Sequence, residues 1–110
     1  MATEFIITEG PGKMDLMLAL FDDKPGGRRR TVVFCMGGGT VLPFPLNGLS
    51  LHVISVERVQ GREYWEIVGN DVERKTGNRV TLWYSTKTRK GTGKIEMPVR
   101  DEDGGTVGYE

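Results

Sequence analysis

The chain is poor in the residues that hold metal ions and disulfides. Its 110 residues include one cysteine, Cys35, and one histidine, His52. A single thiol excludes an internal disulfide, whereas small secreted domains usually carry a disulfide framework. A structural zinc site takes four Cys or His ligands, more than this chain provides. We therefore expect no metal, no other cofactor and a reducing compartment.

Long apolar runs and a net charge are also missing. No apolar run approaches the roughly 18 residues of a membrane-spanning helix. The opening segment, MATEFIITEG, contains acids and lacks the basic-then-apolar order of a leader. We expect a cytoplasmic protein without a membrane anchor. Lys plus Arg and Asp plus Glu number 15 each, so an anionic partner must be met by a local basic patch.

What the chain does have is the composition of a folded domain with many turns. Apolar residues make up 37% and charged residues 27%, values typical of globular proteins. A length of 110 residues fits one hydrophobic core and leaves too little chain for a second. The 16 glycines are roughly twice the average share of about 7%. Tight turns must therefore be frequent.

Short apolar segments alternate with turn residues at roughly ten- to fifteen-residue intervals, as in β-sandwiches and barrels. The predicted strands are residues 4–8, 14–21, 30–36, 49–59, 63–68, 79–86 and 94–99, with a short last one at 106–109. Short connections in the second half predict a meander of antiparallel neighbours. We predict an all-β fold, a small antiparallel β-barrel or a strongly curved sheet of seven to eight strands. Residues 1–99 form the single domain, and residues 100–110 form an acidic, Gly-rich tail that adds the last strand or frays.

Residues 14–21 fit two kinds of secondary structure. Leu16, Leu18 and Leu20 alternate with other residues as in a strand, yet Leu, Met and Ala also favour helices. A turn sequence follows at residues 22–27, and a β-rich segment comes after it. A β-hairpin accounts for residues 14–21 and for the β-rich segment after the turn, so we favour a strand at 14–21 and keep a helix as the alternative.

The middle of the chain carries two irregular features. Residues 40–46 contain two prolines two positions apart, which excludes a central strand and a regular helix and predicts an extended crossing segment. In the strand that follows, the apolar phase changes from Leu51 and Val53 to Ile54 and Val56. A one-residue slip of this kind predicts a β-bulge near Val53.

The zero net charge hides a local concentration of cations. From residue 74 to residue 94 the chain has seven basic residues and no acid: Arg74, Lys75, Arg79, Lys87, Arg89, Lys90 and Lys94. A second basic cluster is Arg28, Arg29 and Arg30. With Trp83 and Tyr84 between the turns, these residues predict a surface for a phosphate backbone and stacked bases.

Other interpretations of the basic segment remain open. Basic hairpin tips keep a protein soluble, and lysines on edge strands prevent sheet-to-sheet aggregation. Neighbouring strand residues point to opposite faces, so at most one of Trp83 and Tyr84 is a platform. Each of these two residues, like Trp65, is either a platform or part of the core. The acidic residues of the tail, from Asp101 to Asp103, provide a third interpretation, in which they cover the basic hairpins.

Three patterns that resemble catalytic or phosphate sites are weak. The glycines at 37–39 follow a strand, but the prolines after them exclude the helix that a phosphate loop needs. Cys35 and His52 form a nucleophile pair only if the fold brings them into hydrogen-bond reach. The strand carboxylates Glu57, Glu63, Glu66 and Glu96 suit acid-base chemistry only as close pairs, and no pair stands out.

A barrel interior is the last candidate site. A barrel of this size is either filled by side chains or holds one small ligand. The residues suited to an adaptable apolar lining are Met14, Met17, Phe34, Met36, Trp65, Trp83 and Met97. A filled core is the simpler use of such large side chains in a short chain.

These patterns favour a non-catalytic binding module over an enzyme. The expected partner is anionic, with nucleic acid or another polyanion as candidates, and the basic hairpins form the contact. A barrel that carries a small apolar ligand is the alternative, together with an interaction domain of undefined partner. No catalytic residue is assigned, and the sequence leaves the oligomeric state open.

Overall fold

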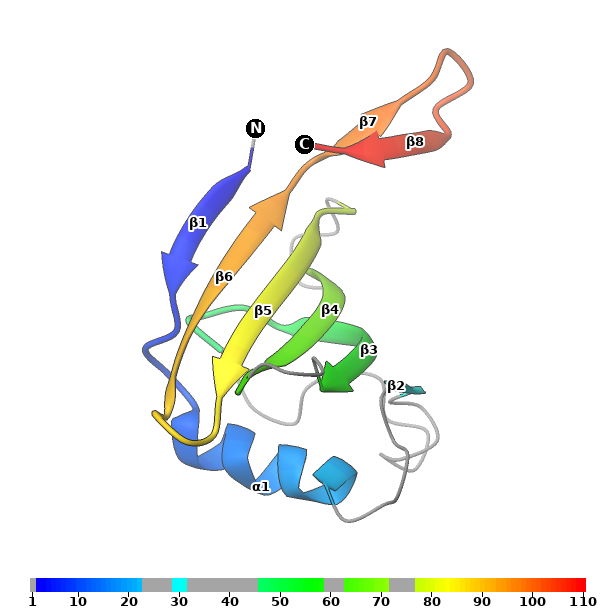
Figure 1. Ribbon diagram of the computed structural model, residues 1–110. Helices are drawn as coiled ribbons and strands as arrows, with labels where there is room; N and C mark the ends of the chain where they lie inside the picture. Colours follow the sequence, from blue (N-terminus) through cyan, green and yellow to red (C-terminus); the bar gives the residue numbers. More distant parts are fainter. Residues whose placement is uncertain (1, 23–28, 32–45, 59–62, 72–76) are drawn as a thin grey trace.

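The computed structural model describes residues 2–22, 29–31, 46–58, 63–71 and 77–110, which form one helix and eight strands (Figure 1). In chain order these are β1 (Thr3–Ile6), α1 (Pro11–Asp22), β2 (Arg29–Thr31), β3 (Leu51–Arg58), β4 (Trp65–Asp71), β5 (Arg79–Ser85), β6 (Lys90–Glu96), β7 (Pro98–Arg100) and β8 (Thr106–Tyr109). The mainly antiparallel β-fold predicted from the sequence is confirmed.

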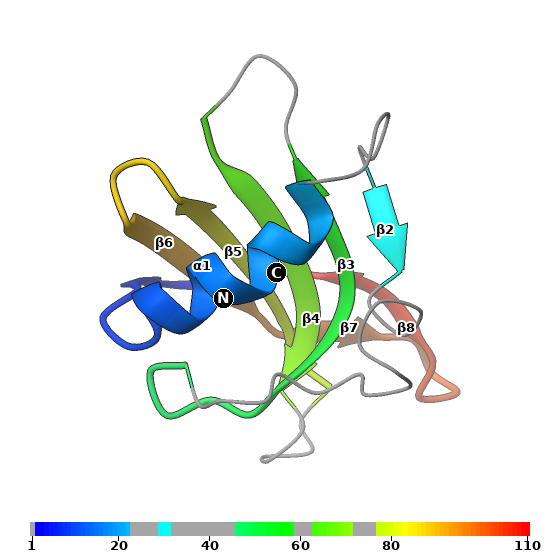
Figure 2. The same ribbon diagram turned by 90° about the horizontal axis from the view of Figure 1, so that it is seen from below.

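The main sheet has the strand order β1-β6-β5-β4-β3-β2. All its pairings are antiparallel, and β3 to β6 follow one another as the predicted meander. β1 lies at one edge and the three-residue β2 at the other. Within the described residues these two edge strands do not pair with each other, so closure into a barrel stays a prediction. The helix α1 lies across one face of the sheet (Figure 2).

The strand favoured for residues 14–21 is wrong, because this segment belongs to α1. Gly10 has φ 89° and Pro11 is the first helical residue, where its fixed φ and missing N–H are tolerated. In the part of the chain that the structure describes, no helix has the length and apolar character needed to cross a membrane.

The buried residues of α1 explain the error. Met14, Met17 and Leu18 are buried against the sheet, at the i, i+3, i+4 spacing of a helix face. Leu16 is 75% exposed, although a strand would have placed it on the same face as Met14. The two-residue alternation of leucines was therefore accidental, and the strong helix propensities of Leu, Met and Ala agree with the fold.

The predicted bulge in β3 is confirmed. The pairing of β3 with β4 shifts register between Val53 and Ser55, which makes Ile54 the extra residue. Ile54 is 49% exposed, while Val53 and Val56 are both buried although they are three positions apart. The bulge thus returns both valines to the same face of the sheet.

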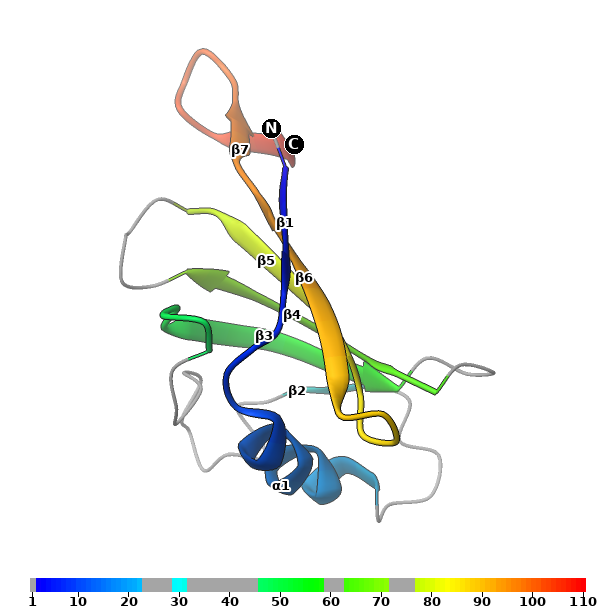
Figure 3. The same cartoon turned by 90° about the vertical axis from the view of Figure 1, so that its left-hand side faces the viewer.

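The ends of several predicted strands differ from the structure. β6 already begins at Lys90, inside the expected turn, and ends at Glu96. The predicted last strand at 106–109 is present as β8 and pairs with β7. The β7–β8 hairpin extends away from the main sheet at the end opposite α1 (Figures 1 and 3).

The predicted crossing segment, residues 40–46, lies outside the described residues except for Leu46. The triple glycine at residues 37–39 also lies outside them.

The hydrophobic core lies between α1 and the inner face of the sheet, which is the face that α1 covers. Its buried residues are Ile7, Met14, Met17, Leu18, Leu46, Leu49, Leu51, Val53, Val56, Trp65, Ile67, Val80, Leu82 and Tyr84. Phe5 of β1 packs against this cluster across Gly93 of β6, where a Cβ would collide with the Phe5 ring. A glycine at that position lets the edge strand bring its aromatic side chain over β6.

A turn at residues 46–49 fixes the corner between β1 and α1. Leu46 and Leu49 pair as an isolated antiparallel β-bridge, and Asn47 and Gly48 form the turn between them. Their φ angles, 49° and 76°, are the positive values of a type I′ turn. The Asn47 Oδ1 accepts hydrogen bonds from the backbone N–H groups of Thr8 (2.9 Å) and Glu9 (3.0 Å). The Asn47 Nδ2 donates to the Ile6 carbonyl at 2.6 Å.

Candidate functional site

Trp83 and Tyr84, the two aromatic residues in the predicted binding surface, are neighbours in β5 and point to opposite faces of the sheet. Tyr84 is fully buried on the inner face, and Trp65 of β4, 3% exposed, joins the same core. Trp83 is only partly buried and lies on the opposite, outer face. Of the pair, only Trp83 lies on the open face, whereas Tyr84 and Trp65 are core residues; a platform role for Trp83 stays a prediction.

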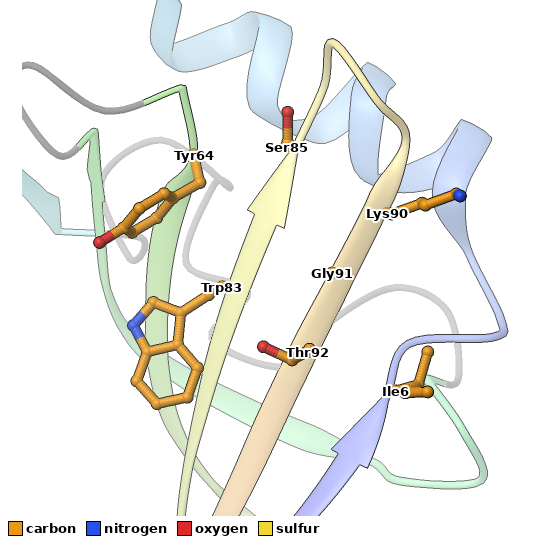
Figure 4. A pocket seen from close by; sticks show the side chains of 7 residues that line it. All are labelled: Ile6, Tyr64, Trp83, Ser85, Lys90, Gly91 and Thr92. Carbon is orange, nitrogen blue, oxygen red and sulfur yellow. The ribbon is translucent and has the colours of Figure 1, made fainter.

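A shallow depression on this outer face is the candidate site, which we call the outer groove (Figure 4). It has a volume of about 580 Å³ and is open to solvent. The residues that line it are Ile6, Tyr64, Trp83, Ser85, Lys90, Gly91 and Thr92. Ile6 from β1 is 69% exposed, so the groove offers apolar surface on both sides of β6. A volume of this size suits one small molecule or one unit of a polymer.

Trp83 is held in place at the centre of the outer face. Its register partners are Glu66 on β4 and Thr92 on β6. The indole Nε1 donates a hydrogen bond of 3.0 Å to Glu66 Oε2. On the β6 side, the Lys94 Nζ lies 5.9 Å from the ring centroid. These contacts restrict the ring, which lowers the entropy that a ligand would lose by ordering it.

Lys90 is the cation among the residues that line the outer groove, and its side chain extends to the side of β6 away from Trp83 and Tyr64 (Figure 4). It is the first residue of β6, opposite Ser85, and its side chain is exposed. Within the described part of the chain, Lys90 has no carboxylate partner. Its ammonium is therefore the most available positive charge at the edge of the groove.

The other described cations of the basic segment are paired with acids. Arg79 donates from Nε (3.2 Å) and Nη2 (3.0 Å) to Glu96 Oε1, and Lys94 Nζ lies 3.7 Å from the same oxygen. Arg79 also lies over the Tyr109 ring, at 4.4 Å from its centroid. Glu96 thus offsets part of the charge that the sequence assigned to this surface.

The turn between β5 and β6 shows the same pattern. Lys87 pairs with Glu63 at 3.0 Å, and both side chains are more than two-thirds exposed. Arg89 pairs with Asp15 of α1 at 2.9 Å. The partners come from outside the basic segment, which is why the sequence alone overstates the local field. Exposed pairs of this kind are also weakened by salt.

Of the remaining predicted anion-binding residues, the two that the structure describes are not in strands that form the groove. Arg29 and Arg30 begin β2, at the far edge of the sheet from β1. Arg28, Arg74 and Lys75 lie outside the described residues. The acidic tail does not cover the basic turn, because the β7–β8 hairpin and the β5–β6 turn lie at opposite ends of β6 (Figure 1).

Beneath the groove, Tyr84 connects the sheet to α1. Its hydroxyl donates to Asp15 Oδ1 at 2.7 Å and lies 3.0 Å from the Pro11 carbonyl oxygen. Burial, together with the hydrogen bond to Asp15, raises the pKa of the Tyr84 phenol from 10.0 to about 12, and Arg89 opposes part of this rise. The helix is therefore fixed to the strand that carries Trp83.

The predicted catalytic patterns gain little from the structure. Cys35 lies outside the described residues, so its distance to His52 is not defined. The strand register places Glu57 opposite Glu66, but the Glu66 carboxylate accepts the Trp83 indole hydrogen bond. Among the described residues, no group of three or more His, Cys, Asp or Glu side chains could hold a metal ion.

The residues proposed to line an interior cavity are not gathered in one place. Met14, Met17 and Trp65 are packed in the core, whereas Met97 is 54% exposed. Trp83 lies on the outer face, away from them. Phe34 and Met36 lie outside the described residues. In the described structure these side chains fill the core or face solvent rather than surround a ligand.

Sequence reasoning missed Tyr64, Ile6, Ser85 and Thr92 as groove residues. Alternation alone indicates that Ile6 lies opposite Phe5 and that Ser85 shares the face of Trp83. Only the register shows that Ile6 and Trp83 both pair with Thr92 and so lie on either side of it. No local signal contains that information, because β1 is distant in sequence from β5 and β6.

Comparison of the chain with protein-family models, with curated protein sequences and with solved structures gave no match. The function is therefore argued from the outer groove and the charges around it.

Proposed function

We propose that the protein is a non-catalytic binding module that receives an anionic partner in the outer groove. The observation that carries this proposal is Lys90, which lines the edge of the groove and has no carboxylate partner among the described residues. Lys94, on the same side of β6 and close to Trp83, is a second cation, but it is shared with Glu96 at 3.7 Å, so the unpaired charge among these described residues is that of Lys90. An anion there gains charge-assisted contacts without first breaking a strong ion pair.

The proposed contact surface includes fewer cations than the basic hairpins contain. Arg79, Lys87 and Arg89 are paired with Glu96, Glu63 and Asp15. These pairs reduce the attraction that their cations exert on a distant polyanion. We therefore assign the main role to Lys90, with Lys94 and Trp83 beside it, and expect moderate affinity that depends on ionic strength.

The test is binding of inorganic polyphosphate, measured by isothermal titration calorimetry at several salt concentrations. We expect log K to fall linearly with log salt concentration. Lys90→Gln should weaken binding and lower the slope by about one. Lys87→Gln is the matched control, because it removes the same charge from the same hairpin outside the groove. Absence of binding at low salt, or equal effects of the two variants, would refute the proposal.

A carrier of a small apolar ligand is the competing proposal. Its support is the apolar surface of Ile6 and Trp83 in the groove, since the interior lining predicted from the sequence is dispersed. An apolar ligand would bind with little dependence on salt and without a requirement for Lys90. Such a result in the same titrations would favour the carrier over the anion-binding module.

A further inference from the structure

We propose that the anionic partner is single-stranded nucleic acid, with one base stacked in the outer groove against Trp83. This inference rests on the proposed function and names its partner. A simple polyanion would use only the charges, yet the groove is also lined by two aromatic side chains, Trp83 and Tyr64 (Figure 4). Aromatic rings on an open sheet surface are stacking partners for unpaired bases of any sequence.

The hydrogen bonding of the Trp83 indole favours stacking of a base on its ring. The hydrogen bond from Trp83 Nε1 to Glu66 uses the only polar atom of the side chain, so the part of the ring that faces the groove is apolar. Tyr64 lines the same groove on the β4 side of Trp83. A base that enters the groove can therefore replace water on apolar ring surface without breaking a hydrogen bond.

Strand β6 provides the matching path for a sugar-phosphate backbone. Lys90, Thr92 and Lys94 alternate outward along it and span on the order of 13 Å, at about 3.3 Å per residue. Thr92, in the middle, is the register partner of Trp83. Two cations with a hydroxyl between them thus run beside the aromatic surface, so phosphates and bases have separate contacts on neighbouring strands.

The geometry favours a single strand over a duplex. In a duplex the bases are stacked on each other and are not available to a ring on a flat sheet surface. In the described residues, no helix or hairpin rises from the groove to enter the major groove of DNA. The ion pairs of Arg79, Lys87 and Arg89 also limit the sequence-independent attraction on which duplex binding depends.

The experiment compares two fluorescein-labelled ten-mers with the same phosphates, oligothymidine and its abasic analogue, by fluorescence anisotropy at low salt with the full chain. We expect the abasic strand to bind about tenfold more weakly, because stacking of one base is lost. Trp83→Ala should remove most of this difference, and Trp83→Phe should restore part of it. Lys87→Gln should leave the ratio of the two affinities unchanged.

Each other outcome has a defined meaning. Equal affinity for the two strands would overturn base stacking while the anion-binding function stands. No binding of either strand would overturn both proposals. A duplex of equal length that binds as tightly as oligothymidine would refute the single-strand preference. Quenching of tryptophan fluorescence by oligothymidine, absent in Trp83→Phe, provides a second readout in which the ring is replaced without truncation of the side chain.

Discussion

At the scale of single residues, the neighbours Trp83 and Tyr84 show how one step along a strand separates function from stability. Trp83 faces the outer groove, whereas Tyr84 is fully buried and bonded to Asp15 of α1. The two rings are similar in size and apolar character, so composition does not distinguish them. Their roles follow from the alternation of a strand that has one covered and one open face.

The raised pKa of Tyr84, about 12, makes stability sensitive to alkaline pH. Because the folded pKa lies above the unfolded value of 10.0, the contribution of this phenol is complete below pH 10 and is lost as pH rises towards about 12. We expect Tyr84 to give a late ionisation phase, towards pH 12, when absorbance at the phenolate band is followed against pH.

The control for this titration is Tyr84→Phe, which should remove only the late phase. The same variant should weaken the dependence of the melting temperature on pH in the alkaline range, because the group that titrates is gone. Absence of a late phase that Tyr84→Phe removes would contradict the assignment.

At the scale of elements, the turn at residues 46–49 determines where α1 begins. The Asn47 side chain accepts three hydrogen bonds, two from backbone N–H groups and one from the Thr8 hydroxyl, and donates one to Ile6. It thereby holds the segment between β1 and α1, which includes the groove residue Ile6. A single asparagine thus ties the connection between β1 and α1 to a turn that is distant in sequence.

Two substitutions of Asn47 should distinguish the contribution of its side-chain hydrogen bonds to stability from the contribution of its backbone conformation. Asn47→Gly keeps the positive φ and loses the side-chain bonds, and we expect it to lower the free energy of unfolding by about 1–3 kcal/mol. Asn47→Ala loses the same bonds and also strains the left-handed backbone, for roughly 1 kcal/mol more. Urea denaturation measures both values, and an unchanged midpoint in Asn47→Gly would show that the bonds are not needed.

At the scale of the whole molecule, the core and the β7–β8 hairpin are largely separate. The core cluster draws its residues from Ile7 to Tyr84, and Ile95 packs against it. The hairpin contains the exposed Val99 and Val107 and extends from the end of β6 (Figure 3). Its main described side-chain contact with the sheet is Arg79 over the Tyr109 ring.

A chain that ends at Met97 should therefore stay folded. The Arg79–Tyr109 contact is worth about 1 kcal/mol, so we expect the melting temperature to fall by roughly 4–8 °C in circular dichroism. Tyr109→Ala in the full chain is the control and should reproduce most of this change. Loss of the cooperative transition in the truncated chain would show that the hairpin belongs to the folding unit.

Much of the fold is determined by local sequence. The β-branched and aromatic segments with Gly-rich turns predicted the meander β3 to β6, and the phase change at Val53 predicted its bulge. These features depend on alternation and turn chemistry, which a short window contains. The secondary structure of residues 14–21 was harder to predict, because alternating leucines fit a strand and a helix equally well over so few residues.

The tertiary structure alone decided the helix and the site. Burial of Met14, Met17 and Leu18 against the sheet selects the helical spacing, a choice that no single segment makes. The seven basic residues of the sequence were visible, but their partners Asp15, Glu63 and Glu96 become neighbours only through strand pairing and helix packing. Likewise, register places Ile6 and Trp83 on either side of Thr92, because hydrogen bonds between distant strands bring these side chains together.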